Sequence, residues 1–361
     1  MSRACSTLCA VLSMTLAAAC NETPSTTLPK VATRPSFTTG NPINTGSQET
    51  YTLAVFGDFP YGAAKMADAP GLFALINSDP KVDIVVHLGD IKAGSNSPCT
   101  TAYFDTIRTL FSTFKDPLVY MPGDNEWVDC HVFSKNNGLF TPTERLQTVR
   151  SMFFPVPGQT LGGRKKQVLT EADDPANSAF VENVMWQESQ VVFAVLNLQG
   201  SNDDLAPWGT PLPADAGNYP SQADERKARI QANDAWLIKA FDLARATDAP
   251  GIVLMFQADM WDATSALSGF DDIVKQIGQL AIDFGKPVLI LEGDSHIFRV
   301  DQPYTPASPL FTLHPATPVA PNVTRLVVEG STNRTEYTRL TVDPKADAGS
   351  LFTWERVPLH P

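Results

Sequence analysis

Short runs of hydrophobic residues alternate with amphipathic segments along most of the chain. Apolar runs that predict buried strands lie at residues 52–56, 82–88, 117–121, 191–198, 251–256 and 287–291. Segments with helical spacing lie at 63–76, with an interruption at Pro70, and at 103–114, 221–246 and 271–284. This alternation predicts an α/β fold in which helices cover a sheet of apolar strands.

The pattern changes in the connecting and C-terminal segments. Residues 128–179 predict loops and short helices, and the Pro- and Gly-rich segment 202–219 predicts a lid or surface loop. Segments 324–329, 337–342 and 351–357 predict antiparallel strands separated by turns.

The N-terminus predicts export. Residues 1–19 resemble a bacterial signal peptide, with Arg3 before an apolar stretch that is too short to span a bilayer. Cys20 follows small residues as in a lipobox, although Ala17 stands where Leu is usual, so we expect a lipid anchor to the membrane at Cys20. Free secretion after residues 17–19 is the alternative, and either places the protein in the bacterial periplasm or cell envelope, or outside the cell. Residues 20–50 predict a flexible tether and 51–357 the folded domain.

Two cysteines remain in the domain. Cys99 and Cys130 follow two of the strand ends discussed below, and in an oxidising compartment we expect them to form a disulfide. Such a bridge contributes roughly 3–4 kcal/mol on the chain-entropy account. A pair of free thiols is the alternative.

The charge balance limits the possible partners. A net charge of −12 argues against binding to a nucleic-acid backbone, which requires a basic surface. It is compatible with a small phosphorylated substrate, because a bound metal can supply positive charge locally.

Four of the predicted strands end in the same dipeptide, Gly-Asp. The acidic residues are Asp58, Asp90, Asp124 and Asp294, and His296 follows the last of them. Strand ends fix the backbone while leaving the next side chain free to project, so we expect these carboxylates to converge at one sheet edge. Carboxylates gathered in one pocket repel one another unless a cation neutralises them or they take up protons.

The order of these motifs resembles the calcineurin-like metallophosphoesterase family over about residues 51–357. The matching segments are Gly57-Asp58-Phe59-Pro60, Gly89-Asp90, Gly123-Asp124-Asn125-Glu126, Gln257 after its strand, and Gly293-Asp294-Ser295-His296. The resemblance implies a four-layer αββα sandwich of two mixed sheets flanked by helices, with a two-metal site at the strand ends. Pro60, Asp124, Asn125, Gln257 and Asp294 depart from the family pattern, mostly by replacing histidines.

The resemblance also implies roles for these residues. Asp58 and His296 would hold one metal, Asp124, Gln257 and Asp294 the other, and Asp90 would bridge the two. Because the replacements ligate through oxygen, we expect two divalent ions, Mg²⁺, Mn²⁺ or Ca²⁺ rather than Zn²⁺. Asn125 would donate a hydrogen bond to a phosphate oxygen. The candidate catalytic residues that the resemblance implies are Asn125, Asp90 and His296.

Three further residues are weaker candidates. Glu126 could orient Asn125, with an ordinary helix-start acid as the alternative. Arg299 and Arg334 could bind the phosphate of a substrate, with a surface salt bridge as the alternative for each.

Two functions therefore follow from the sequence. The first is a metal-dependent phosphoester hydrolase, a phosphatase or phosphodiesterase, that uses a metal-bound hydroxide at an oxygen-rich two-metal site. The second is a catalytically inactive binding protein of the cell envelope with the same fold, which the missing histidines would explain.

Overall fold

The computed structural model describes residues 42–95, 97–132 and 140–360. The predicted signal peptide, Cys20 and most of the tether lie outside these residues. Within the described part, no helix is long and apolar enough to cross a membrane. Residues 42–49 already contact the folded domain, because Gln187 N–H donates to Pro42 O at 2.8 Å and Ser189 Oγ donates to Glu49 O at 2.5 Å.

One sheet has six strands in the order β13-β12-β1-β2-β3-β4. The strands are β1 (Tyr51–Phe56), β2 (Ile84–His87), β3 (Pro117–Tyr120), β4 (Leu161–Gly162), β12 (Glu336–Val342) and β13 (Phe352–Pro358). Strands β1, β2 and β3 run parallel, and the others pair antiparallel. The carboxyl ends of β1, β2 and β3 therefore lie at the same edge of this sheet.

The second sheet has seven strands in the order β10-β11-β9-β8-β7-β6-β5. The strands are β5 (Leu169–Thr170), β6 (Val184–Glu188), β7 (Val191–Val195), β8 (Ile252–Met255), β9 (Val288–Glu292), β10 (Arg299–Asp301) and β11 (Val323–Val327). Strands β7, β8, β9 and β11 are parallel to one another. Both sheets are thus mixed.

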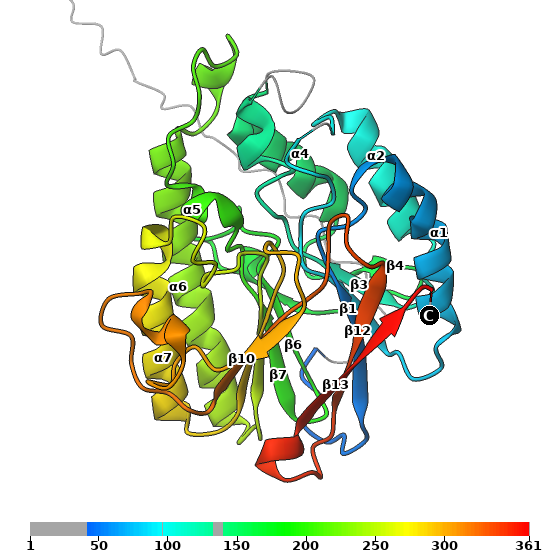
Figure 1. The fold of residues 1–361 in the computed structure, drawn as a ribbon, viewed down its shortest axis with the longest axis vertical. Coiled ribbons are helices and arrows are strands. Elements are labelled where there is room, and N and C mark those ends of the chain that lie inside the picture. Colours follow the sequence, from blue (N-terminus) through cyan, green and yellow to red (C-terminus); the bar gives the residue numbers. More distant parts are fainter. Residues whose placement is uncertain (1–41, 96, 133–139, 361) are drawn as a thin grey trace, which may run out of the picture. The chain divides into compact units, whose positions relative to one another are not determined.

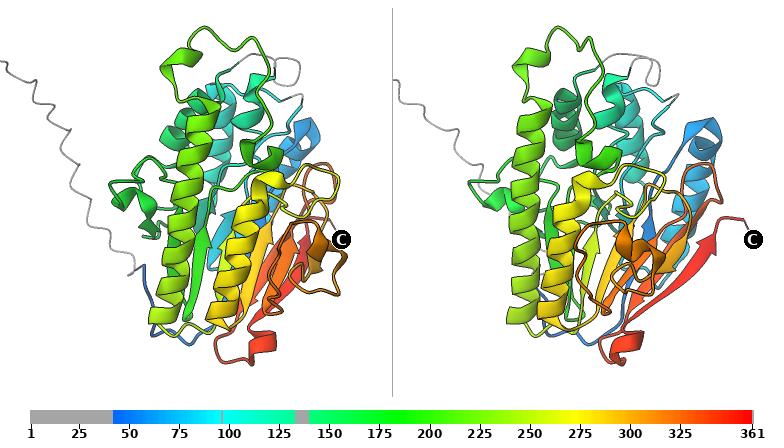
Figure 2. Two further views of the ribbon diagram at one scale, coloured as in Figure 1. Left: turned by 90° about the vertical axis from the view of Figure 1, so that its left-hand side faces the viewer. Right: turned by 60° about the vertical axis from the view of Figure 1, so that its left-hand side comes forward.

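Helices cover the outer faces of the two sheets. The helices are α1 (Gly62–Ser78), α2 (Thr101–Phe111), α4 (Pro142–Phe153), α5 (Gly200–Asp204), α6 (Gln222–Ala246) and α7 (Asp271–Phe284). Figure 1 and Figure 2 show α1, α2 and α4 on one side of the sheets and α6 and α7 on the other. The predicted four-layer αββα arrangement is confirmed.

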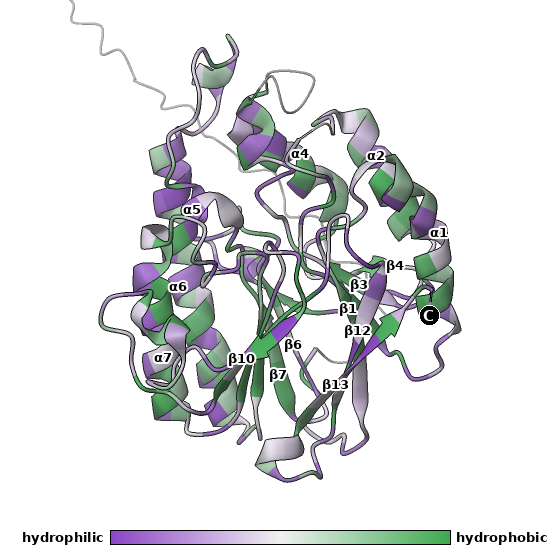
Figure 3. Cartoon of the chain, in the orientation of Figure 1, coloured by the Kyte–Doolittle hydropathy of each residue, from purple (hydrophilic) through white to green (hydrophobic). Residues whose placement is uncertain are grey.

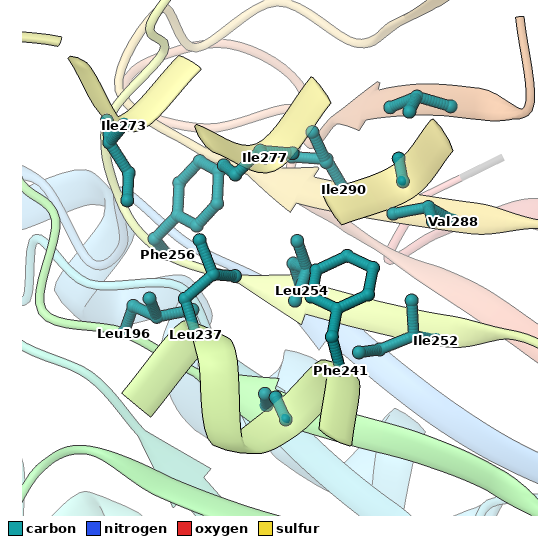
Figure 4. Close-up of a cluster of buried hydrophobic side chains, with 14 of the residues drawn as sticks. Leu196, Leu237, Phe241, Ile252, Leu254, Phe256, Ile273, Ile277, Val288 and Ile290 are labelled. Carbon is teal, nitrogen blue, oxygen red and sulfur yellow. The ribbon is translucent and has the colours of Figure 1, made fainter. Parts of the chain in front are cut away.

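Alternating side chains on each strand build the layers. In β1, Leu53 and Val55 face the core between the sheets, whereas Ala54 and Phe56 face the helices. Figure 3 shows the apolar colour concentrated in the central strands. In Figure 4, Leu237 and Phe241 of α6 pack with strand residues of the second sheet, as Ile273 and Ile277 of α7 also do. The central strands of each sheet are buried on both faces, which explains the nearly continuous apolar runs in the sequence.

Several local predictions differ from the structure. Helix α1 continues through Pro70, which is exposed, without the expected interruption. The region 128–179 contains the short helix α4 among loops, as expected, but also the strands β4 and β5, and neither these nor β6 were predicted. Strand β11 joins the second sheet parallel to β9, whereas β12 and β13 lie in the first sheet.

The predicted disulfide between Cys99 and Cys130 is present, with Cα atoms 5.8 Å apart. Both cysteines are buried and pack with the first-sheet helices. The bridge joins the segment after Asp90 to the segment after Asp124, so it links two loops that begin at the strand ends.

His87, the last residue of β2, is a core histidine. Its ring is fully buried, its Nε2 lies 2.8 Å from Phe59 O, and the rings of Phe56 and Phe111 lie 4.8 and 5.2 Å away. Burial lowers the pKa of His87 to about 4. The neutral ring is therefore the stable form in the folded protein.

Replacing His87 with Gln should weaken the acid sensitivity of folding. The unfolded chain takes up a proton near pH 6.5 and the folded chain only near 4, so stability falls as pH decreases through this window. The wild type should lose on the order of 2 kcal/mol more than His87→Gln between about pH 7.5 and about pH 5. Glutamine does not titrate, and its amide can still donate to Phe59 O. Urea denaturation at the two pH values measures the difference, and equal losses would refute the assignment.

Candidate metal centre

Five side chains from four strand ends meet at one edge of the two sheets. Asp58, Asp90 and His296 form one group of candidate metal ligands, and Asp90, Asp124 and Asp294 form another. Within each group, one ligand atom of each residue lies within 4.8 Å of the others. Asp90 belongs to both groups, and the sixth predicted ligand, Gln257, lies beside them with its amide nitrogen 3.2 Å from Asp90 Oδ2.

Unusual backbone conformations turn these side chains out of the strands. Asp58, Asp90, Asp294 and His296 have φ values of 49°, 58°, 66° and 64°. These values lie in the left-handed region, which Asp and His tolerate better than most residues do. Such conformations are frequent at functional sites, where the surrounding structure compensates for their cost.

Two glycines of the Gly-Asp pairs leave room for the neighbouring carboxylates. A Cβ on Gly123 would overlap the Asp90 carboxylate, and a Cβ on Gly293 would lie 2.5 Å from Asp58 Oδ2. Each glycine thus makes space for the aspartate of another strand end. The repeated dipeptide reflects this interlocking arrangement and not only the need for a turn.

Hydrogen bonds hold the central carboxylate of Asp90. The Tyr61 hydroxyl donates to Asp90 Oδ2 at 2.8 Å. Asn125 donates to Asp90 Oδ1 through its backbone N–H at 3.1 Å and to Asp90 Oδ2 through its side-chain amide at 2.6 Å. The Asn125 amide also donates to the Tyr61 hydroxyl at 2.8 Å. Tyr61, which the sequence analysis did not select, therefore shares the site with Asn125.

The remaining acids have their own partners. Asp58 accepts hydrogen bonds from Asp294 N–H at 3.0–3.1 Å and lies 3.3 Å from His296 Nε2. Asp124 accepts from the Ser201 hydroxyl at 2.5 Å. These contacts fix the carboxylates close together despite their like charges.

The electrostatic consequence is a set of raised pKa values. Burial, followed by the nearby carboxylates, raises the pKa of Asp90 and of Asp294 well above the usual range for aspartate. Burial and the charge of Asp129 raise the pKa of Asp124 to about 7. Burial alone would lower the pKa of His296, but its contact with Asp58 outweighs this effect and raises it.

This donor set fits divalent cations. Carboxylate oxygens dominate, one imidazole joins them, and no arginine or lysine is among the described residues that line the adjoining pocket. A divalent ion would neutralise the carboxylates, which otherwise hold protons. The structure supports binding of divalent metal at this site.

The amide of Gln257 is oriented differently from the predicted ligand. Its Oε1 accepts a hydrogen bond from Gly200 N–H at 2.6 Å, while its Nε2 faces Asp90 Oδ2 at 3.2 Å and Asp124 Oδ1 at 3.4 Å. In this orientation Gln257 donates hydrogen bonds to two acids. Ligation through its oxygen would require the amide to rotate and Gly200 N–H to lose its acceptor.

Glu126 does not orient the Asn125 side chain. Its Oε1 accepts from the Tyr120 hydroxyl and from Gly123 N–H, both at 2.7 Å. It therefore holds the turn that carries Asp124, and Tyr61 and Asp90 orient the Asn125 amide instead.

The two predicted phosphate-binding arginines are not among the described residues that line the pocket. Arg299 lies 3.9 Å from Asp259, and the exposed Arg334 donates to His360 O at 3.2 Å. The alternative of an ordinary ion pair fits Arg299 better.

A buried ionic network lies next to the site and contacts it at Asp294. Arg325 is fully buried and contacts Asp259, Glu292 Oε2 at 3.2 Å and Asp301 Oδ2 at 2.7 Å. Asp259 N–H in turn faces Asp294 Oδ2 at 3.4 Å. The network therefore fixes the backbone beside Asp294.

The acids open onto a pocket of about 580 Å³. The other side chains with hydrogen-bonding groups in its lining are His296, Tyr61, Ser95, Ser97, Asn125, Ser331 and Thr332. Hydroxyl and amide donors of this kind can bind the oxygens of a phosphoryl group next to the acids.

Comparison with known proteins finds only distant structural similarity. No protein-family model matches the chain, and no curated protein matches it significantly. Among solved structures, it is similar to GAP50, the anchor in the inner membrane complex of Plasmodium (12% identity, TM-score 0.44, 86% of this chain and 90% of that chain). It is also similar to a dimetal phosphatase from Danio rerio (12% identity, TM-score 0.47, 86% of this chain and 96% of that chain). At these scores the function rests on the residues of this chain.

Replacing Arg325 with Met should destabilise the protein by about 3–5 kcal/mol, because Asp259, Glu292 and Asp301 would lose their shared cation in a buried place. Chemical denaturation measures the loss. Arg108→Met removes an ion pair with Asp105 in which both side chains are about half exposed, and should cost about 0–1 kcal/mol. Adding Asp259→Asn to Arg325→Met should recover part of the loss. Similar losses for Arg325→Met and Arg108→Met would contradict the role assigned to the network.

Proposed function

We propose that the protein is a divalent-metal-dependent phosphoester hydrolase. One observation carries the proposal: two groups of candidate ligands, Asp58–Asp90–His296 and Asp90–Asp124–Asp294, share Asp90 at the strand ends of two sheets. The order of the Gly-Asp motifs supports it as well. Mg²⁺, Mn²⁺ and Ca²⁺ suit the oxygen-rich donor set better than Zn²⁺, and two ions would satisfy both groups.

The chain's own residues have definable tasks in this reaction. Asp90 would hold both ions, and Asp58, His296, Asp124 and Asp294 would each hold one. The bound ions would supply charge neutralisation and Lewis-acid activation of water. The Asn125 amide and the Tyr61 hydroxyl would bind phosphoryl oxygens, since both reach the pocket beside Asp90.

The missing acid catalyst restricts the substrate. Asn125 can donate a hydrogen bond but cannot transfer a proton to a leaving group. The pKa of Tyr61 is raised well above its ordinary value by burial and by the Asp90 charge, so its hydroxyl is a weaker acid than a free tyrosine and gives up its proton less readily. We therefore expect small phosphoesters with leaving groups that depart without protonation.

Export is part of the proposal. The disulfide is compatible with an oxidising compartment, and we propose a signal peptide at residues 1–19 and lipid attachment at Cys20. Free secretion remains the alternative outcome, which mass spectrometry of the mature N-terminus distinguishes.

Asp90→Asn should abolish hydrolysis. We expect the wild type to hydrolyse p-nitrophenyl phosphate or bis(p-nitrophenyl) phosphate with Mn²⁺ or Mg²⁺, and chelator to stop the reaction. Losing partners of metal ligands already costs 10–100-fold, so removal of the shared ligand should cost at least about 100-fold. Asp105→Asn on the exposed side of α2 is the control and should leave turnover unchanged.

The inactive binding protein is favoured by one observation, the amide of Asn125 at the position where the family has histidine. Such a protein would bind Mn²⁺, as measured by elemental analysis of protein purified without chelator. It would hydrolyse neither p-nitrophenyl phosphate nor bis(p-nitrophenyl) phosphate with Mg²⁺, Mn²⁺, Ca²⁺ or Zn²⁺. Turnover that persists in Asp90→Asn would instead refute the assignment of the reaction to this metal site.

A further inference from the structure

Four of the five residues of α5 (Gly200–Asp204), those after Gly200, form a left-handed turn next to the candidate metal centre. Ser201, Asn202, Asp203 and Asp204 have φ values of 54°, 58°, 55° and 58°. Four consecutive L-residues in this conformation are uncommon, because each brings its Cβ close to the following carbonyl oxygen. A strained segment of this kind persists only where surrounding contacts fix it, and such segments cluster at functional sites.

The outer end of the turn is anchored firmly. The buried Arg229 of α6 forms an ion pair with Asp203, and Arg226 donates to Asp203 O at 2.9 Å. The side chain of Asn202 accepts from Gly269 N–H at 2.7 Å, just before α7 begins. Helix α6 and the start of α7 thus hold the turn from the side away from the acids.

The inner end of the turn touches the acids directly. A Cβ on Gly200 would lie 2.8 Å from Asp294 Oδ2 and 3.0 Å from Asp124 Oδ1, so only glycine fits at that position. The next residue, Ser201, donates its hydroxyl hydrogen bond to Asp124 Oδ2 at 2.5 Å. Gly200 N–H holds the oxygen of Gln257, whose amide nitrogen faces Asp124 Oδ1.

We propose that Ser201 is a positioning residue, which the left-handed turn places so that its hydroxyl fixes the Asp124 carboxylate for metal binding. This inference rests on the proposed function, because it assigns Asp124 as a ligand. With Ser201 Oγ on one oxygen and the Gln257 amide beside the other, the carboxylate is restrained against rotation. Preorganised ligands bind metal more tightly, since less conformational freedom is lost on binding.

Two glycine substitutions separate this role from a structural one. Ser201→Gly has two opposing effects on the metal-free protein, because it removes a hydrogen bond to Asp124 and relieves the positive φ, so its stability should stay close to that of the wild type. Its affinity for Mn²⁺ should fall by about 10–100-fold. Asn202→Gly makes the same backbone change one residue further on and also removes the acceptor of Gly269 N–H, but it leaves the Ser201 hydroxyl and the Arg229–Asp203 ion pair in place. Its Mn²⁺ affinity should therefore stay within about threefold of the wild type. Calorimetric titration of metal-free protein with Mn²⁺, together with urea denaturation, measures both quantities.

Each outcome supports or overturns the assignment. Weaker Mn²⁺ binding in Ser201→Gly with retained stability and an unaffected Asn202→Gly supports it. Equal Mn²⁺ affinity in wild type and Ser201→Gly overturns it and leaves the proposed hydrolase intact. Equal weakening in both variants assigns the effect to the turn as a whole and overturns the role of the hydroxyl. If the wild type binds no Mn²⁺, the proposed function fails and the inference fails with it.

Discussion

Repulsion between closely placed carboxylates is the constraint on which the rest of the site depends. Asp58, Asp90 and Asp124 are buried and Asp294 is partly buried, with their oxygens in two groups that share Asp90. Two like charges 4 Å apart repel by about 4 kcal/mol at an effective dielectric constant of 20. The folded chain answers this with hydrogen-bond donors from Tyr61, Asn125, Ser201 and Gln257 and with raised pKa values. A divalent cation would relieve the same repulsion without protons. The close carboxylates that destabilise the folded chain when nothing neutralises them therefore also favour metal binding.

The stability of the two-sheet core offsets the free-energy cost of this concentration of charge. Residues in left-handed conformations cost about 1–2 kcal/mol each, and the site contains Asp58, Asp90, Asp294, His296 and the turn at 201–204. The strands that carry these residues are buried on both faces and are paired on both sides in their sheets. Rigid strands allow the acids to be held a few ångströms apart, and the buried Arg325 network and the Cys99–Cys130 bridge fix the segments that follow them.

The sequence carried the positions of the acids but not the way in which they are held. Apolar runs ending in Gly-Asp located Asp58, Asp90, Asp124 and Asp294, because the buried strands and the close approach at glycine are both visible as local sequence patterns.

Tyr61 was adjacent to a motif and could have been considered. Arg325, a charge inside an apolar strand, could have been recognised as needing a buried partner. Ser201 and the orientation of Gln257 depend on contacts between segments more than 50 residues apart, as the hydrogen bonds Ser201–Asp124 and Gly200–Gln257 show. The Asn-Asp-Asp run that tolerates the left-handed turn was only a weak local signal. Helix α1 passes through Pro70 because that position faces solvent, which a single sequence does not reveal.

In the proposed hydrolase, the side chain of Asn125 affects which substrates can react. Its amide is a hydrogen-bond donor beside Asp90 and, unlike a histidine, does not exchange protons near neutral pH. The donors that remain around the pocket are hydroxyls and amides, which orient phosphoryl oxygens and do not protonate a departing alkoxide. His296 contacts Asp58 and belongs to a ligand group, so as a ligand it would present a neutral nitrogen to the metal and could not act as an acid at the same time. For a hydrolase built on these residues, the barrier to leaving-group departure is lowered chiefly by electrostatic stabilisation of phosphoryl charge and by the intrinsic acidity of the leaving group. For the proposed hydrolase, the hydroxyl and amide donors in the described lining of the pocket therefore favour phosphoesters whose leaving groups are stable as anions, and the oxygen-rich ligand set suits hard cations that would stabilise phosphoryl charge.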